Sequence, residues 1–497
     1  MTGRTAASSS RVAFSSVDGR RSTSAAGRTV VADSLRNVDL ESAERAANAK
    51  TWRHEYVEHF QRSTTLSATR HQNALQIARD GLTSLRSHMC LSTADGDEPL
   101  SLPPGRPSST QTTGLGGQGR PTPVLEVPYA GRTLSGASLR EQLDRWADDG
   151  VVEPAFAQAL TAVADQPEAL ALPGRTAVLL GAAAAMGPLV HLSRWGARVL
   201  AVDVPVTAVQ QRIATLAGNG SGRTLVPTRA GRDIPGLSLS QELSEIFGWI
   251  TAHLEDTSPV LGAHFYADGG AHVELTAAAD LLAEELCRHD ARTALAYLAT
   301  PTDSFLVSSD AVAQSRQRWR NPRWNTLPRR FLHTGSGGRL FAPVYEQLYR
   351  DEQGTSWGVI DTLVTAQGPN YALAKRAQRW RAMAAAADGT TVSANVAPSA
   401  WTNSVIKNKT LAAVFRAAHR YGVEIFHPET AAALMAAKLA ADVAGLTPRP
   451  PRHPEALFSH DAAHGGLWRQ PFEPRSALGL AAARGMTLER RQAPGLG

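Results

Sequence analysis

The sequence predicts an α/β protein: a doubly wound parallel sheet with large insertions and an added helical region at its N-terminus. From residue 173 onward, short apolar runs alternate with stretches of helical periodicity. The first of these runs leads into a turn of small residues, and the second ends in an acid. Strands that alternate with helices form a parallel sheet that is covered on both faces.

Length and composition indicate a globular protein of several units. The chain has 497 residues, which is too long for one ordinary domain. Hydrophobic residues at 43% and charged residues at 19% exclude wholesale disorder. The two cysteines, Cys90 and Cys287, lie far apart and form no metal-type pair. A disulfide scaffold is therefore excluded, and a reducing, cytoplasmic location is expected.

The charge pattern favours a small-molecule substrate over a macromolecular partner. Only five of the 51 basic residues are lysine, and arginine with alanine is typical of a high-GC bacterial genome. The chain has no long basic run, so no nucleic-acid partner is expected. The longest apolar stretch, residues 177–190, contains Pro188 and is short for a membrane span, so no membrane partner is expected.

Changes in composition divide the chain into six segments. Residues rich in Ser, Arg and Thr open the chain, helical spacing of aromatic residues and leucine follows, and a stretch crowded with Pro, Gly and Ser interrupts it. We expect a disordered tail at 1–35, a helical region at 36–100, a linker at 101–125, a helical lead-in at 126–172, the main α/β domain at 173–470 and a C-terminal tail at 471–497.

Six strands and one helix organise the predicted sheet around the first motif. The expected strands, in order, are 176–180 and 198–202, then a third at 261–267, a fourth at 294–299, a fifth at 358–363 and a further one at 391–397; the first helix is expected at 187–195.

The turn between the first strand and its helix is built of small residues. Gly181, Ala185 and Gly187 let a backbone approach a pyrophosphate, whose charge then lies at a helix N-terminus. Asp203 closes the second strand, where a carboxylate accepts the ribose hydroxyls of NAD and repels the 2′-phosphate of NADP. The alternatives are a tight packing turn without a cofactor and a methyltransferase, which also places an acid on a ribose.

A second motif pairs a tyrosine with one of the rare lysines. Tyr371 and Lys375 are four residues apart at the start of a predicted helix and therefore share one face. A nearby cation favours phenolate and lowers the pKa of a tyrosine toward a range useful for proton transfer. The other interpretation is a surface helix pair.

The order of these motifs, followed by Ala394-Asn-Val-Ala-Pro398, resembles the short-chain dehydrogenase/reductases over about residues 175–443. The resemblance implies a Rossmann-like domain in which Tyr371 is the acid/base and Lys375 binds the nicotinamide ribose. It also implies NAD contacts for further residues: Gly181, Ala185 and Gly187 at the pyrophosphate, Asp203 at the ribose, Asp268 at the adenine, Thr300 after the fourth strand, and Pro398 and Thr402 at the nicotinamide.

The chain departs from the family in its length and at the catalytic serine. The distance from Gly181 to Tyr371 is 190 residues, longer than the family norm, so insertions are expected at about 205–255 and 303–350. The family's serine usually stands about thirteen residues before the tyrosine, where this chain has Gly358. Thr362 at the end of the expected fifth strand is our preferred source of the hydroxyl, with Thr365 or Ser356 as alternatives.

The sequence thus predicts an NAD-dependent enzyme, with NADP less favoured, that moves hydride to or from a carbonyl or alcohol carbon. A catalytically silent dinucleotide-binding subunit and an S-adenosylmethionine-dependent methyltransferase stay open as alternatives. The family is commonly oligomeric, so a homo-oligomer is possible. His460 and His464 have a spacing that fits two metal ligands, but they lack an obvious third, so no metal is expected.

Overall fold

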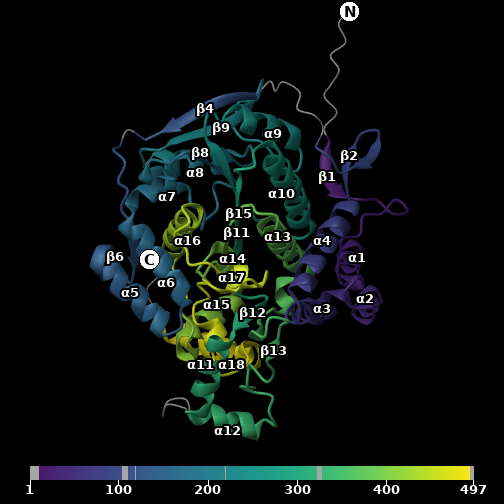
Figure 1. Ribbon diagram of the computed structural model, residues 1–497, viewed down its shortest axis with the longest axis vertical. Coiled ribbons are helices and arrows are strands. Elements are labelled where there is room, and N and C mark those ends of the chain that lie inside the picture. The colour runs from purple at the N-terminus through teal and green to yellow at the C-terminus, as the bar shows by residue number, and fades with distance from the viewer. Residues whose placement is uncertain (1–9, 103–109, 118, 219, 322–326, 493–497) are drawn as a thin grey trace, which may run out of the picture.

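The computed structural model describes residues 10–102, 110–117, 119–218, 220–321 and 327–492. A seven-stranded, mostly parallel sheet runs through its centre (Figure 1). The strand order is β15-β11-β10-β7-β8-β9-β4, and only β4 runs antiparallel to its neighbour. The strands are β4 (Thr110–Gly116), β7 (Arg175–Leu180), β8 (Arg198–Val202), β9 (Arg223–Arg229), β10 (Ser258–Ala263), β11 (Ala294–Ala299) and β15 (Thr391–Val396). The protein is therefore a mixed α/β protein.

Helices cover both faces of this sheet because its strands are apolar on both sides. In β7, Ala177 and Leu179 belong to one core, whereas Val178 and Leu180 belong to the other. The first core includes side chains of α7 (Leu189–Trp195), α8 (Thr207–Gly218) and α16 (Pro428–Val443). The second includes side chains of α9 (Leu243–Ala252), α10 (Gly270–His289) and α13 (Pro369–Ala387).

Two predictions about the strands are wrong. The insertion expected at 205–255 contains β9, which is the third parallel strand in chain order. Strand β10 is therefore the fourth parallel strand and β11 the fifth. The strand expected at 358–363 is β14 (Ser356–Asp361), which lies outside this sheet. It forms a separate antiparallel sheet with β12 (Ser304–Ser308) and β13 (Tyr349–Arg350), because the chain between β11 and α13 folds back on itself.

The N-terminal tail expected to be disordered at 1–35 is ordered from its tenth residue onward. It forms β1 (Arg11–Phe14), which pairs with β2 (Met89–Thr93) and through it with β3 (Gly96–Pro99), and helix α1 (Thr23–Arg36). The tail has few apolar side chains, and three of them, Val12, Val30 and Leu35, are completely buried. Helices α2 (Leu40–Ala47), α3 (Trp52–Ser67) and α4 (His71–Ser87) lie beside α1 (Figure 1). They occupy the region expected to be helical at 36–100, which also contains the strands β2 and β3.

The expected linker at 101–125 and the expected tail at 471–497 are also structured in the described part of the chain. The linker supplies β4 at the sheet edge, because its Thr and Gly residues pair with β9 through backbone groups. The tail supplies α18 (Pro474–Gln492), which packs on α15 (Lys409–Ala417). The lead-in at 126–172 holds the hairpin β5 (Val127–Tyr129) and β6 (Arg132–Leu134), then α5 (Gly136–Asp148) and α6 (Pro154–Asp165).

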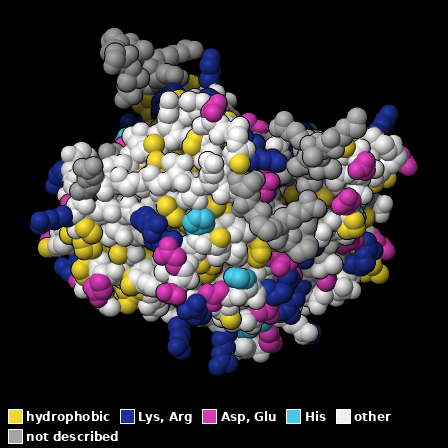
Figure 2. Space-filling view, turned by 90° about the horizontal axis from the view of Figure 1, so that it is seen from above, with side chains coloured by type: hydrophobic (Ala, Val, Ile, Leu, Met, Phe, Trp, Pro, Cys, Tyr) yellow, Lys and Arg dark blue, Asp and Glu magenta, His cyan; other side chains and the backbone are white. Residues whose placement is uncertain are grey.

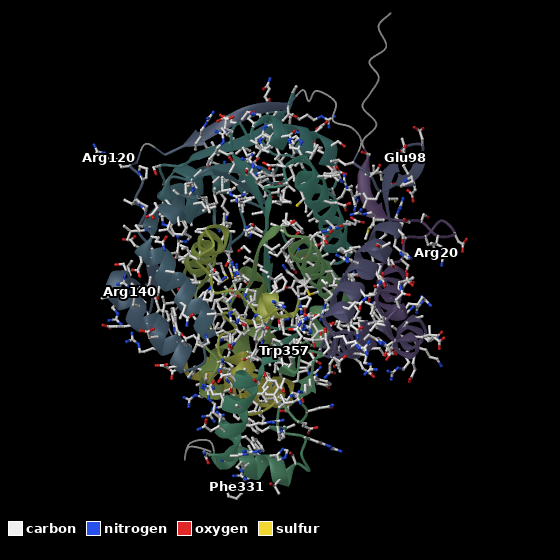
Figure 3. All side chains as sticks on the ribbon, viewed as in Figure 1. Arg20, Glu98, Arg120, Arg140, Phe331 and Trp357 are labelled. Atoms are coloured by element: carbon white, nitrogen blue, oxygen red, sulfur yellow. The ribbon has the colours of Figure 1, made fainter. Side chains whose placement is uncertain are left out.

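The insertion after β11 forms the lower part of the molecule. It carries α11 (Ser309–Arg320) and α12 (Leu327–Gly335), and Phe331 of α12 lies at the outer tip with 76% of its side chain exposed (Figure 3). The remaining short helices are α14 (Asn403–Lys407) and α17 (Ala456–Ser459). Figure 2 shows basic and acidic side chains interspersed over one face of the molecule. None of the helices in the described ranges is long and apolar enough to cross a membrane.

Candidate functional site

Two of the predicted catalytic residues, Tyr371 and Lys375, lie where the carboxyl ends of β10 and β11 meet the N-termini of α10 and α13. His264 follows β10 directly, and Thr300 follows β11. His272 stands in the first turn of α10, and Tyr371 in the first turn of α13. The rings of His272 and Tyr371 are 5.5 Å apart between centroids, and the ring of Tyr266 lies 6.2 Å from Tyr371. Ligands of open parallel sheets bind at this edge.

Tyr371 lies beside the side chain of Thr300, which the sequence analysis did not assign to it. Burial raises the pKa of Tyr371 well above the ordinary value of a phenol, and the Thr300 side chain opposes only part of this rise. The hydroxyl of Thr300 itself lies 2.8 Å from that of Thr302. The neighbouring Lys375 does not lower the pKa of Tyr371 as expected. Tyr371 therefore keeps its proton at neutral pH.

Lys375 lies one turn further along α13 and is largely buried. Its ammonium donates to the backbone carbonyl of Leu298 at 3.1 Å and to Oε1 of Gln378 at 3.2 Å, which are both neutral acceptors. Burial lowers the pKa of Lys375 to about 8. Most of the population is still charged at neutral pH, so the site holds a cation without a carboxylate bonded to it.

Two histidines near Lys375 have no polar partner in the structure. Neither ring nitrogen of His264 or of His272 makes a hydrogen bond. Burial first, and then the charge of Lys375, lower the pKa of His264 to about 4 and that of His272 to about 3. Both imidazoles are therefore neutral and can each donate one hydrogen bond and accept one. A single histidine belongs to no recognisable motif, so His264 and His272 could not be selected from the sequence.

Thr362 lies away from Tyr371, and its hydroxyl is hydrogen-bonded to backbone carbonyl groups. Its hydroxyl lies 2.7 Å from the carbonyl oxygen of Pro301 and 2.9 Å from that of Asp303, and its side chain is buried. It follows β14, which is outside the parallel sheet. Thr300 follows β11, the fifth parallel strand, so the structure brings Thr300 rather than Thr362 to Tyr371. Sequence spacing could not show this, because the folded insertion between Thr300 and Tyr371 hides their proximity.

The glycine turn is shaped first by packing. Gly181 has φ +79°, and a Cβ there would lie 2.6 Å from the backbone nitrogen and Cα of Phe265. The turn also closes on itself, because the amide of Ala184 donates to Gly181 and that of Gly187 donates to Ala184. Helix α7 begins only at Leu189, beyond Ala185 and Gly187. Close backbone packing alone therefore explains the glycine at 181.

Asp203 ends β8 as predicted and binds this same turn. Its Oδ2 accepts the amide of Ala183 at 3.0 Å, and its Oδ1 accepts the amide of Val204 at 2.9 Å. Burial raises the pKa of Asp203, and these two amides oppose the rise. Each oxygen keeps a further acceptor site, so the carboxylate still fits a ribose hydroxyl.

The other predicted cofactor contacts are spread around the sheet edge. Asp268 is exposed, accepts the Tyr266 hydroxyl at 2.8 Å, and follows the fourth strand rather than the third, so its match to the adenine-contacting aspartate is wrong. Pro398 is buried after β15, and the amide of Thr402 donates to Ala400. Within the described ranges, no three metal-ligating side chains gather, and His464 instead bonds to Glu153 at 3.0 Å.

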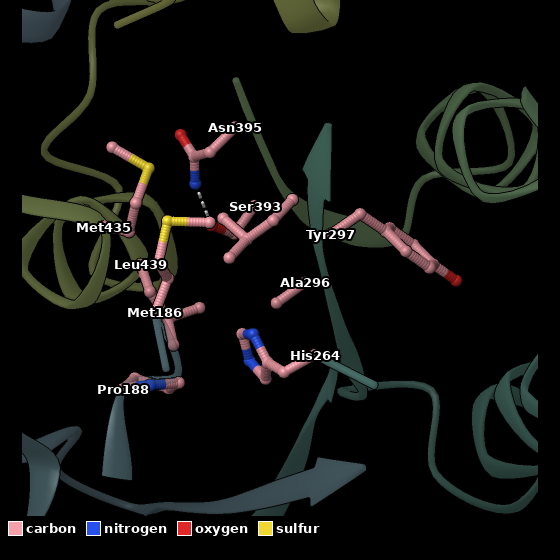
Figure 4. Close-up of a pocket in the computed structure, with 10 residues that line it drawn as sticks. Met186, Pro188, His264, Ala296, Tyr297, Ser393, Asn395, Met435 and Leu439 are labelled. Atoms are coloured by element: carbon pink, nitrogen blue, oxygen red, sulfur yellow. Dashed lines mark hydrogen bonds between the residues drawn. The ribbon is translucent and has the colours of Figure 1, made fainter. Parts of the chain in front are cut away.

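One small cavity adjoins the site on the α16 face of the sheet. It is lined by His264, Ala296, Asn395 and Met435, among others, and its volume of about 10 Å³ admits one water-sized molecule (Figure 4). Asn395 Oδ1 also lacks a partner. This cavity is too small for a nicotinamide ring, so a dinucleotide would have to lie at the open carboxyl edge of the sheet. The unpaired ring nitrogens of His264 would fit its polar groups there.

Comparison of this chain with protein-family models, with curated proteins and with solved structures found no match.

Proposed function

We propose that the protein is an NAD-dependent oxidoreductase of the short-chain dehydrogenase/reductase type that moves hydride to or from a carbonyl or alcohol carbon. The observation that carries the proposal is the juxtaposition of Thr300, Tyr371 and Lys375. The threonine follows the fifth parallel strand, and the tyrosine and lysine share one face of the helix that leads to the sixth.

The strand order supports a Rossmann-like, doubly wound interpretation of the sheet. Numbered from β7, the six parallel strands lie in the order 3-2-1-4-5-6, which is that of dinucleotide-binding folds. Asp203 ends the second strand and Gly181 follows the first. Asp203 would accept hydrogen bonds from the hydroxyls of the adenosine ribose. Its negative charge would repel the 2′-phosphate of NADP and so favour NAD.

The residues of the chain have separate roles in this proposal. Tyr371, whose burial keeps it protonated, donates its proton to the carbonyl oxygen during reduction and takes it back during oxidation. The side chain of Thr300, which lies beside the phenol, would orient it. Lys375 would hold the nicotinamide ribose, and its charge stabilises negative charge that develops on the phenol or the substrate oxygen. NAD(H), when bound, supplies or accepts the hydride.

A catalytically silent dinucleotide-binding subunit is the second candidate. The observation in its favour is the raised pKa of Tyr371, since an acid/base with a pKa near the working pH transfers protons faster. The two candidates share the cofactor and differ only in turnover.

The test is a titration of the purified protein with NADH, NADPH and S-adenosylmethionine, followed by cofactor fluorescence and thermal shift. We expect NADH to bind most tightly and its binding to weaken at least about tenfold in Asp203→Asn. A screen of carbonyl substrates should then show activity that Tyr371→Phe and Thr300→Val lose while still binding NADH. Binding without turnover would favour the silent subunit, and S-adenosylmethionine binding alone would overturn both.

A further inference from the structure

The N-termini of α10 and α13 lie side by side at the mouth of the site. Thr23, at the start of α1, contacts both. Its Oγ1 accepts from the side-chain amide of Asn370 at 3.3 Å, and its Cγ2 lies 2.7 Å from where a Cβ on Gly270 would be. Within these same first turns, the ring centroids of His272 and Tyr371 are 5.5 Å apart. Two helices of 20 and 19 residues therefore point their positive ends at one place.

Neither helix neutralises that end with its own side chains. The N-cap residues are Gly269 and Gly368, which have no side chain to accept a hydrogen bond, and neither first turn contains an acid. The amides of a first helical turn lack intrahelical acceptors and are usually satisfied by a capping side chain, by water or by a ligand. Two uncapped ends side by side therefore form an anion-binding arrangement.

A buried polar side chain beside these ends also lacks partners. His272 is only 1% exposed, yet neither of its ring nitrogens makes a hydrogen bond with any described residue. The nearby Lys375 ammonium, which is bonded only to neutral oxygens, adds positive charge to this region. A buried imidazole whose donor and acceptor are both unpaired is costly unless a ligand completes its hydrogen bonds.

We propose that the first turns of α10 and α13, together with His272, bind a carboxylate or phosphate group of the substrate. The anion site stands on the geometry alone, whereas its assignment to the substrate rests on the proposed oxidoreductase function. A dinucleotide's own pyrophosphate is expected at the turn before α7, beside Asp203, and not at α10. The substrate class is therefore a carbonyl or alcohol compound that carries an acidic group.

The negative charge of one nearby acid, Asp268, opposes anion binding at this site, so its removal should increase the affinity. Asp268 immediately precedes the N-cap of α10, and its Oδ1 accepts the hydroxyl of Tyr266, which is 59% exposed. Its charge repels an incoming anion, so Asp268→Asn should tighten anion binding. Ala271, at the second position of α10, is exposed and can be replaced without disturbing the core.

The experiment titrates the full-length protein with inorganic phosphate and with acetate by calorimetry. We expect Ala271→Asp to lower the affinity at least about tenfold, because its carboxylate occupies the helix end, while the melting temperature is kept or raised. The matched variant Ala271→Asn should stay within about twofold of the wild type, and Asp268→Asn should bind more tightly. The site is overturned if neither anion binds, or if Ala271→Asp binds like the wild type.

Repeating the titration with the protein saturated in NADH separates the two possible sources of the anion. Unchanged phosphate affinity supports a substrate group, and competition with NADH overturns that assignment in favour of the cofactor. If NADH itself fails to bind while phosphate binds and responds to Ala271→Asp, the oxidoreductase proposal fails and the anion site stands.

Discussion

Two buried lysines show how differently one residue type is used in this protein. Lys375 has only neutral partners, and its pKa is lowered by burial. Lys438 is completely buried between Asp442 and Asp461, and these carboxylates raise its pKa above the ordinary value in spite of burial. The first lysine costs stability and the second supplies it, which is the contrast expected between a functional residue and a structural one.

Replacing Lys375 with methionine should stabilise the fold at neutral pH. A lysine with a pKa of about 8 in the folded state and 10.5 when unfolded destabilises the protein by up to about 3 kcal/mol below pH 8. Between about pH 8 and pH 10.5 the unfolded chain binds more protons at this lysine than the folded protein does, so wild-type stability rises with pH there. The gain in Lys375→Met should therefore shrink between pH 7 and pH 9.5, as urea unfolding would measure.

Lys438→Met is the matched control, with the opposite sign. It leaves two buried carboxylates without their cation and should cost about 3–5 kcal/mol at pH 7. Equal effects of the two substitutions would mean that Lys375 has a structural partner after all.

The lysine at 375 could be chosen from sequence because lysine is scarce in this chain and stands four residues after a tyrosine. The placement of Thr300 beside Tyr371 and the importance of the two histidines could not be predicted from the sequence. Thr300 is separated from Tyr371 by a folded insertion, and His264 and His272 acquire their meaning only from the convergence of two strands and two helices.

At the scale of elements, apolar runs were predictable, whereas the two strands at the β4 end of the sheet were not. Strands β7, β8 and β11 occur where the sequence places them because their residues are apolar on both faces, and β15 does so although Ser393 and Asn395 make one of its faces polar. Strand β9 contains Pro227 and charged ends, and β4 is mostly Thr and Gly, so neither has the composition of a buried strand. Their pairing comes from backbone hydrogen bonds, which composition does not record.

The last helix, α18, offers a direct test of the packing that turns an expected tail into an element. A Cβ at Gly485 would overlap the backbone carbonyl of Ala413 in α15, whereas a Cβ at Gly479 would meet nothing within 4 Å. Gly485→Ala should separate α15 from α18 and destabilise the protein by about 1–3 kcal/mol. Gly479→Ala should stabilise it by up to about 1 kcal/mol through helix propensity.

Chemical denaturation followed by tryptophan fluorescence would compare the two variants. A Gly485→Ala protein as stable as Gly479→Ala would show that α18 is not docked as described.

At the scale of the whole molecule, one buried network joins parts that are distant in sequence. Asp303, after β11, accepts Arg376 on one oxygen and Arg379 on the other, both at 2.9 Å. Arg376 also donates to Thr64 of α3, and Arg379 to Glu455 before α17. The N-terminal helices, the sheet and the C-terminal region are thus connected through one carboxylate.

Asp303→Asn should destabilise the protein by about 3–5 kcal/mol, because it leaves two buried guanidinium groups with half their counter-charge. Asp388 pairs with Arg79 while both side chains are more than half exposed, so Asp388→Asn should change the free energy of unfolding by less than about 1 kcal/mol. Thermal and urea unfolding of both variants would measure this difference. Similar values would show that the network does not hold the parts together.

The contact between α4 and α13 also sets an order for folding during synthesis. Gly81 of α4 leaves room for the indole ring of Trp380, which would otherwise lie within 2.7 Å of a Cβ. The ribosome releases α4 early and α13 late, so the first helices emerge long before the surface they cover. Chains of this kind depend on contacts between distant segments, which form slowly and leave apolar surface exposed in the meantime. The N-terminal helices therefore leave the apolar surface that packs on α13 exposed until α13 has been synthesised.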